Sequence, residues 1–299
     1  MKNFFVIFAI FLFSSSCSVQ KMAVRQTAGF LTEAAPAFEK EFDLDLAEEA
    51  IPANLMVMEG LLHIDPLNPD LLLLLSKGFG GYAFSFLENK MEIYEKNLNK
   101  YHYFKKRAQD TYRRARDYAL KHLSKEEAFK KALSSDFETF ENSLKIFGGE
   151  EVPFLFWAGY NWGNLVNVSK ENPEELADLS KAEALMRRVL QLDENYFYGS
   201  AHLFLGVFYG SRPPMLGGDF KKSKFHFEKA LEVSQGRFLL ASYMYARFYA
   251  VQTQDEVLFE RHLRRVMKAK ADILPEQRLA NEMAKLRAQR ALKQKGQFF

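Results

Sequence analysis

A pattern of side-chain sizes recurs along the chain. A small residue is followed four positions later by a large apolar one, and three positions after that by a small or apolar one. Residues three and four apart share one face of an α-helix, so each copy marks a face where a second helix can approach closely. The clearest copies are Ala108, Tyr112 and Ala115; Ala182, Met186 and Val189; and Ser223, Phe227 and Ala230.

No run of the sequence shows the convincing apolar and polar alternation of a β-strand. The recurring pattern is typical of the second helix of a tetratricopeptide repeat (TPR), and Leu205, Gly206 and Tyr209 give the matching first-helix pattern. The copies are irregularly spaced, which indicates inserted loops. We therefore predict an all-α fold, a helical repeat array of cryptic TPR-like helix hairpins.

Prolines and glycine pairs divide the sequence into helical segments. Helices are predicted over residues 43–63, 69–89, 92–122, 124–146, 153–169, 173–191, 195–210, 219–234, 237–252, 255–271 and 275–294. Four regions follow: a signal peptide (1–17), an N-terminal tether or first helix (18–42), a TPR-like domain (43–272) and a basic C-terminal helix (273–299).

The first residues, MKNFFVIFAIFLFSSSC, have the layout of an export signal. Lys2 precedes an apolar run from Phe4 to Phe13, and small residues lead to Cys17, the only cysteine. This arrangement resembles a bacterial lipoprotein box, with Ser14 at the position where leucine is usual. It predicts lipidation of Cys17 and anchoring on the periplasmic side of the envelope, with Ser18 favouring the outer membrane. The alternative is an ordinary signal peptide removed together with Cys17.

Charge and motifs exclude several classes of function. Lys and Arg number 41 against 38 Asp and Glu, a net charge of +3, so nucleic acid is a poor default partner. The sequence contains neither an HExxH nor a GxSxG motif. We predict no catalytic residues, no metal and no cofactor. The enzymatic alternative is a pair of carboxylates distant in sequence.

Five features, in order, resemble the T-component family of tripartite ATP-independent periplasmic (TRAP) transporters. They are the signal ending in Cys17, DPLNPDLLLLLSKGFGGYAFSFLE, TYRRARDYALKHL, PFLFWAGYNWGNLVNVSKENPE and GVFYGSRPPMLGGDFKKSKFHFEKALE. The resemblance covers about residues 45–270. It implies a periplasmic lipoprotein that associates with the substrate-binding (P) component of a TRAP system and self-assembles, as a trimer.

The aromatic segment 153–169 holds the candidate binding residues. Helical spacing places Trp157, Asn161 and Asn164 on one stripe, with Phe156 and Tyr160 beside it. Rings and amides together suit a groove for a peptide segment or a small organic solute. Ordinary packing of these aromatic residues is the alternative.

The segment SRPPMLGGDF, residues 211–220, is the most conspicuous loop. No strand precedes it and the anionic Asp219 follows its glycines, so a phosphate-binding loop is not indicated. Asp219 instead suits the N-cap of the next helix. The loop is longer than a usual repeat turn, which predicts a ligand or partner contact centred on Arg212, or else a rigid connector.

Two functions remain open at this point. The first is a TRAP accessory protein that binds the P component and contacts its ligand. The second is a general TPR scaffold lipoprotein for envelope assembly, with no link to a transporter.

Overall fold

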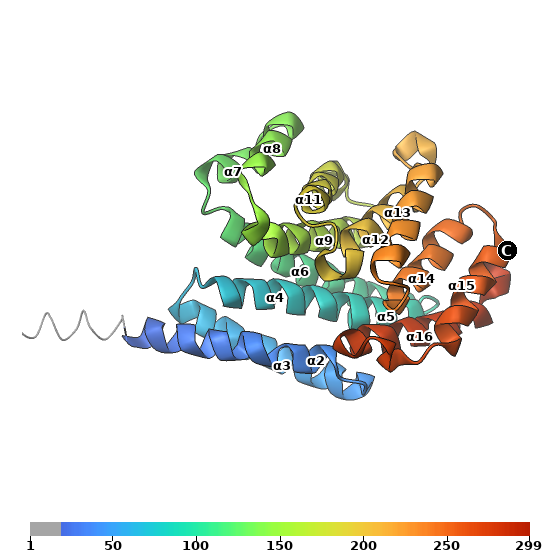
Figure 1. Cartoon of the computed structure of the whole chain (residues 1–299), viewed down its shortest axis with the longest axis horizontal. Coiled ribbons are helices and arrows are strands. Elements are labelled where there is room, and N and C mark those ends of the chain that lie inside the picture. The colour runs from blue at the N-terminus through green and yellow to red at the C-terminus, as the bar shows by residue number, and fades with distance from the viewer. Residues whose placement is uncertain (1–18) are drawn as a thin grey trace, which may run out of the picture.

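The computed structural model describes residues 19–299, and within that range the protein is helical and contains no strand (Figure 1). This confirms the predicted all-α array. Cys17 and the proposed signal peptide lie outside the described residues. Among residues 19–299, no helix has the length and apolar character needed to cross a membrane.

The helices follow one another closely along the chain. Residues 19–34 are helical. After them come α2 (Pro36–Glu39), α3 (Leu44–Ile64), α4 (Pro69–Tyr82), α5 (Glu88–Ile93), α6 (Leu98–Leu123), α7 (Glu127–Ala132), α8 (Phe137–Ser143), α9 (Val152–Val168), α10 (Pro173–Ala177), α11 (Leu179–Leu192), α12 (Tyr196–Gly210), α13 (Phe220–Val233), α14 (Leu239–Tyr245), α15 (Glu256–Lys268) and α16 (Arg278–Lys293).

Local sequence explains where the helices begin. The side chains of Asn68 and Asp219 accept hydrogen bonds from backbone N–H groups in the first turns of α4 and α13. Such caps satisfy donors that have no partner inside the helix. Pro69, Pro153 and Pro173 occupy first turns, where proline costs no hydrogen bond. The predicted N-cap role of Asp219 is confirmed.

The predicted helix over residues 124–146 is divided in the structure, as is the one over residues 173–191, which forms α10 and α11. Residues 124–146 form α7, α8 and a short 3-10 turn instead of a single helix. Asp136 caps α8 by accepting from the Thr139 N–H at 2.9 Å, so a new helix begins there. Phe129 and Phe140 then pack together, with ring centroids 5.8 Å apart. In a straight helix these two residues would lie about 16 Å apart along the axis, so the break is what brings both rings to the same buried site.

Long helices pack mainly on those nearest in sequence, as expected for a repeat array. Successive pairs run from α3 and α4 to α15 and α16, with α7 and α8 bypassed by contact of α6 with α9. The interior forms two apolar clusters, one centred on α4, α9 and α11 and the other on α14, α15 and α16. Ile51, Tyr160 and Phe197 pack against both clusters, so the two meet along these side chains.

The array closes on itself. Helix α16 packs against α2 and α3 as well as α14 and α15, and Figure 1 shows its red ribbon meeting the blue N-terminal helices. Gln277 donates to Glu39, and Arg290 donates to Asn89 Oδ1 at 2.6 Å. Arg287 and Lys285 also donate to backbone carbonyls of other segments, so several side chains of the basic C-terminal helix make internal contacts.

The predicted close approach at Gly206 can be tested directly. A Cβ at this position would lie 2.9 Å from Cγ of the fully buried Phe227 ring. We expect Gly206→Ala to lower the free energy of unfolding by about 1–3 kcal/mol, because the ring has no room to move aside. Chemical denaturation measures this change.

Gly60→Ala is the matched control. Gly60 lies inside α3, and nothing lies within 4 Å of a Cβ placed there. Its substitution should leave the protein unchanged or stabilise it by up to about 1 kcal/mol, through helix propensity alone. Equal effects of the two substitutions would contradict the close-packing interpretation of Gly206.

Candidate functional site

A cavity of about 570 Å³ lies where the two apolar clusters meet. Its walls come from almost the whole chain, from α2 and α3 through α9 and α12 to α14 and α16. This volume is in the range of pockets that bind small organic molecules. Most of the lining is aliphatic or aromatic, so the cavity favours a ligand with a substantial apolar part.

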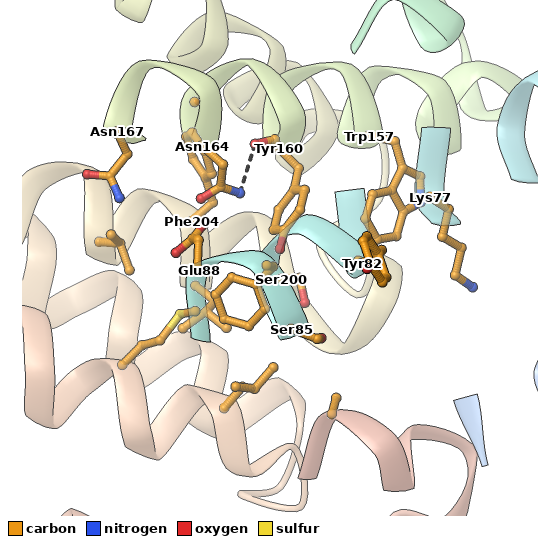
Figure 2. Close-up of a pocket in the computed structure, with 18 of the residues that line it drawn as sticks. Lys77, Tyr82, Ser85, Glu88, Trp157, Tyr160, Asn164, Asn167, Ser200 and Phe204 are labelled. Carbon is orange, nitrogen blue, oxygen red and sulfur yellow. Dashed lines mark hydrogen bonds between the residues drawn. The ribbon is translucent and has the colours of Figure 1, made fainter. Parts of the chain in front are cut away.

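Helix α9 supplies one wall, and Figure 2 shows Trp157, Tyr160, Asn164 and Asn167 projecting from the same side of it. Phe156 also lines the cavity, and its ring lies 5.1 Å from Trp157 and 6.0 Å from Tyr160. Asn164 Nδ2 donates to the Tyr160 carbonyl at 3.0 Å. Four of the five α9 residues singled out from the sequence therefore lie together at a cavity wall.

Asn161 does not lie with them. It is fully buried against α4, where its Nδ2 donates to the carbonyl and the hydroxyl of Ser76, each at 3.1 Å. The neighbouring Gly80 leaves the space that the Asn161 amide occupies. The predicted place of Asn161 on one cavity stripe with Trp157 and Asn164 was therefore wrong, because the cavity side of α9 runs through Tyr160 instead.

An unusual backbone segment places Phe197 at the cavity. Phe197, Tyr198 and Gly199 have φ of 46°, 61° and 74°, so three successive residues are left-handed at the start of α12. Large side chains rarely adopt this conformation, which costs of order 1–3 kcal/mol each. The Phe197 ring packs 5.4 Å from Trp157, and Lys77 lies over it at 5.3 Å. The sequence predicts a helix over residues 195–210, with no sign of this left-handed segment at its start.

Two helices contain a π-helical turn beside the cavity. Residues Ala83–Leu87 follow α4 and Ala246–Ala250 follow α14, where the sequence predicts uninterrupted helices. The widened turns present Phe84 and Ser85 on one side, and Arg247 and Phe248 on the other, to the cavity. Such turns are frequent at functional sites, since the extra residue turns side chains away from the regular helical face.

A group of charged residues forms part of the wall. Glu88 accepts a hydrogen bond from the Tyr112 hydroxyl. Burial raises the pKa of Glu88 from 4.5 to about 6, although the Arg287 guanidinium and the Tyr112 hydroxyl both act to lower it. Arg287 is 3% exposed and donates to the Phe84 carbonyl at 2.6 Å, with a Glu92 oxygen 3.8 Å away. A carboxyl group with a raised pKa thus faces the cavity.

The loop 211–218 forms part of the rim. Ser211, Arg212 and Pro213 line the cavity, while Met215 points outward and is 94% exposed. Arg212 stacks on the Phe208 ring at 3.7 Å and donates through Nε to the Phe208 carbonyl at 3.0 Å. The glycines serve loop geometry: Gly217 has φ of 83°, and a Cβ on Gly218 would meet the Arg212 carbonyl oxygen at 1.8 Å.

The structure also pairs two histidines, one from α12 and one from α13. His202 and His226 approach through Nδ1 at 2.8 Å, and His202 Nε2 lies 3.1 Å from Glu194. Within residues 19–299, no group of three or more His, Cys, Asp or Glu side chains is arranged to hold a metal ion.

The comparison with protein families decides the identity of the chain. The family model of the TRAP transporter T-component matches residues 40–299, nearly the whole chain. The chain belongs to the TRAP transporter T-component family. Membership makes it an accessory component of a TRAP transporter, and the family is not known as one of enzymes. A comparison with curated proteins gave no match.

Several cavity residues of this T-component protein were not predicted from its sequence. Glu88, Lys170, Phe197 and Arg287 all line the cavity. Lys170 lies within the quoted VSKENPE segment, three residues after Asn167, so extension of the α9 spacing by one turn was a usable signal. Arg287 lies 203 residues from its partner Phe84, and local spacing contains no signal for such a pairing.

The titration of Glu88 predicts a pH-dependent stability. Between its ordinary pKa of 4.5 and the folded value of about 6, the folded chain holds a proton that the unfolded chain releases. Glu88 therefore favours folding at low pH, and this contribution is lost as the pH rises through 6. We therefore compare the free energy of unfolding of Glu88→Gln with that of the unsubstituted protein. We expect this difference to shift in favour of the variant by up to about 2 kcal/mol between acid and neutral pH.

Denaturation at a series of pH values measures this difference, with Glu127→Gln as the control. Glu127 is an exposed residue of α7 whose side chain is 67% accessible. A free-energy difference for Glu88→Gln that stays constant across the series would contradict the burial of a titrating carboxyl group.

Proposed function

We propose that this protein is a lipid-anchored accessory protein on the periplasmic side of the cell envelope, in a TRAP-type uptake system. It binds the substrate-binding P component and holds the solute, or an apolar part of it, in the cavity. The observation that carries the proposal is a large, mainly apolar cavity bordered by an exposed loop, in a chain of the T-component family.

The loop 211–218 is the proposed contact with the P component. Met215 is an exposed apolar side chain of this loop, which also contributes Arg212 and Pro213 to the cavity wall, and the lining residue Leu176 is 42% exposed. Exposed apolar groups beside a ligand opening suit a protein contact that shields the solute during transfer. Self-assembly, as a trimer, is part of the proposal and rests on the family resemblance.

Co-purification tests the contact with the P component. The tagged protein should retain a TRAP substrate-binding protein from the same organism after gentle extraction. We expect Met215→Asp to reduce the amount retained by roughly tenfold, because a charge would be buried at the contact. Val257→Asp is the matched control: Val257 is 78% exposed on α15 and does not line the cavity.

Retention that is equal for both variants would contradict the placement of the contact. No retention by the unsubstituted protein would contradict the association itself and would favour the general envelope scaffold. Analytical ultracentrifugation of the purified protein tests the trimer separately.

The anchor is tested by Cys17→Ala. Lipidation needs the cysteine thiol, so this variant should leave the membrane fraction and appear in the soluble periplasmic extract. Fractionation followed by immunoblotting measures the change, with Ser16→Ala as the neighbouring control. An unchanged membrane fraction for Cys17→Ala would show that the lipoprotein-box interpretation is wrong.

A further inference from the structure

The charges around the cavity are not evenly compensated. Five cationic side chains line it: Lys77, Lys170, Arg212, Arg247 and Arg287. Lys77 forms an ion pair with Glu39, and Arg287 has a Glu92 oxygen 3.8 Å away. Arg247 covers the ring of Phe298, with its guanidinium carbon 4.1 Å from the ring centroid. Lys170 and Arg212 also form no ion pair in the described part of the chain, and Arg212 donates to the Phe208 carbonyl and covers the Phe208 ring.

These two cations lie near the ends of packed helices. Lys170 follows the last turn of α9, and Arg212 follows the last turn of α12, which contacts α9. Burial and the neighbouring Arg212 charge both lower the pKa of Lys170, while Glu88, beyond ion-pair distance, acts to raise it. Burial also lowers the pKa of Arg212, with Glu183 and Tyr209 acting in the opposite direction.

Amide groups and apolar side chains adjoin this pair. Figure 2 shows Asn164 and Asn167 on the cavity side of α9, in the turns that lead to Lys170. Phe204 and Phe208 lie on the facing side of α12, and their rings are 6.3 Å apart. A hydrogen-bonding, cationic end is therefore continuous with an apolar interior.

On the basis of the proposed solute-handling function, we propose that the cavity binds amphipathic monoanions, with the anionic group at Lys170 and Arg212 and the apolar chain among the aromatic residues. Partly desolvated cations gain most from an anion that donates no proton and accepts several hydrogen bonds. An uncharged head would leave both cations without an ionic partner, and a cationic head would be repelled.

A structural role for the same residues makes a different prediction. Cations near helix C-termini stabilise the helix dipole, with or without a ligand. In that case their removal would change stability but would not change the preference among ligands that differ only in the head group. The experiment must therefore measure head-group preference.

Isothermal titration calorimetry with dodecanoate, dodecanol and dodecyltrimethylammonium, below their micelle concentrations, measures that preference. The protein is the full chain carrying Cys17→Ala, purified without detergent. We expect dodecanoate to bind roughly tenfold or more tightly than dodecanol, and the cationic probe to bind most weakly. Lys170→Met with Arg212→Met should remove the advantage of dodecanoate and leave dodecanol binding unchanged.

Lys268→Met is the matched control, because Lys268 is an exposed cation in the last turn of α15 and does not line the cavity. Several results would overturn the proposal: equal binding of dodecanoate and dodecanol, an equal loss of both in the double variant, or the same loss of preference in the control. Failure of every probe to bind would also overturn it. Co-purification with the P component is independent of all these outcomes, so it separates this inference from the proposed function.

Discussion

The return of α16 to the N-terminal helices is the contact on which the rest of the structure depends. An array that packs each helix on its neighbours leaves a concave surface open to solvent. Here Arg287 and Arg290 of α16 donate to Phe84 and Asn89, about 200 positions earlier in the chain, and Gln277, just before α16, donates to Glu39, 238 positions earlier. A buried guanidinium is costly unless its hydrogen bonds are accepted, so these contacts favour one position of α16 against the earlier helices. They place α16 across this surface, where Leu279, Ala280 and Arg287 form part of the cavity wall.

The cavity carries energetic costs that a purely structural core would avoid. Left-handed Phe197 and Tyr198, the two π-helical turns and a carboxyl group with a raised pKa all lie at this one place. Strain and polar burial concentrated around one space are the pattern expected of a binding site.

The family assignment rests on the sequence and the cavity on the structure, and both point to the handling of a solute. A T-component protein is an accessory to solute uptake, and its chain contains an apolar cavity with polar groups and a rim loop. The glycines of SRPPMLGGDF are required by the backbone of that loop, which leaves Met215 exposed and Arg212 at the rim. The loop 211–218 thus forms a structural border of the cavity.

Local sequence determined the helices and much of one cavity wall. Asp219 as a cap, the small residues facing Phe227, and Phe156, Trp157, Tyr160 and Asn164 on α9 all follow from helical spacing, which depends only on nearby residues. Tertiary structure decided that Asn161 faces Ser76, that Phe197 is left-handed and that Arg287 reaches Phe84. Spacing fixes which residues share a helix face, but the packing of distant helices decides whether that face meets protein or an open cavity.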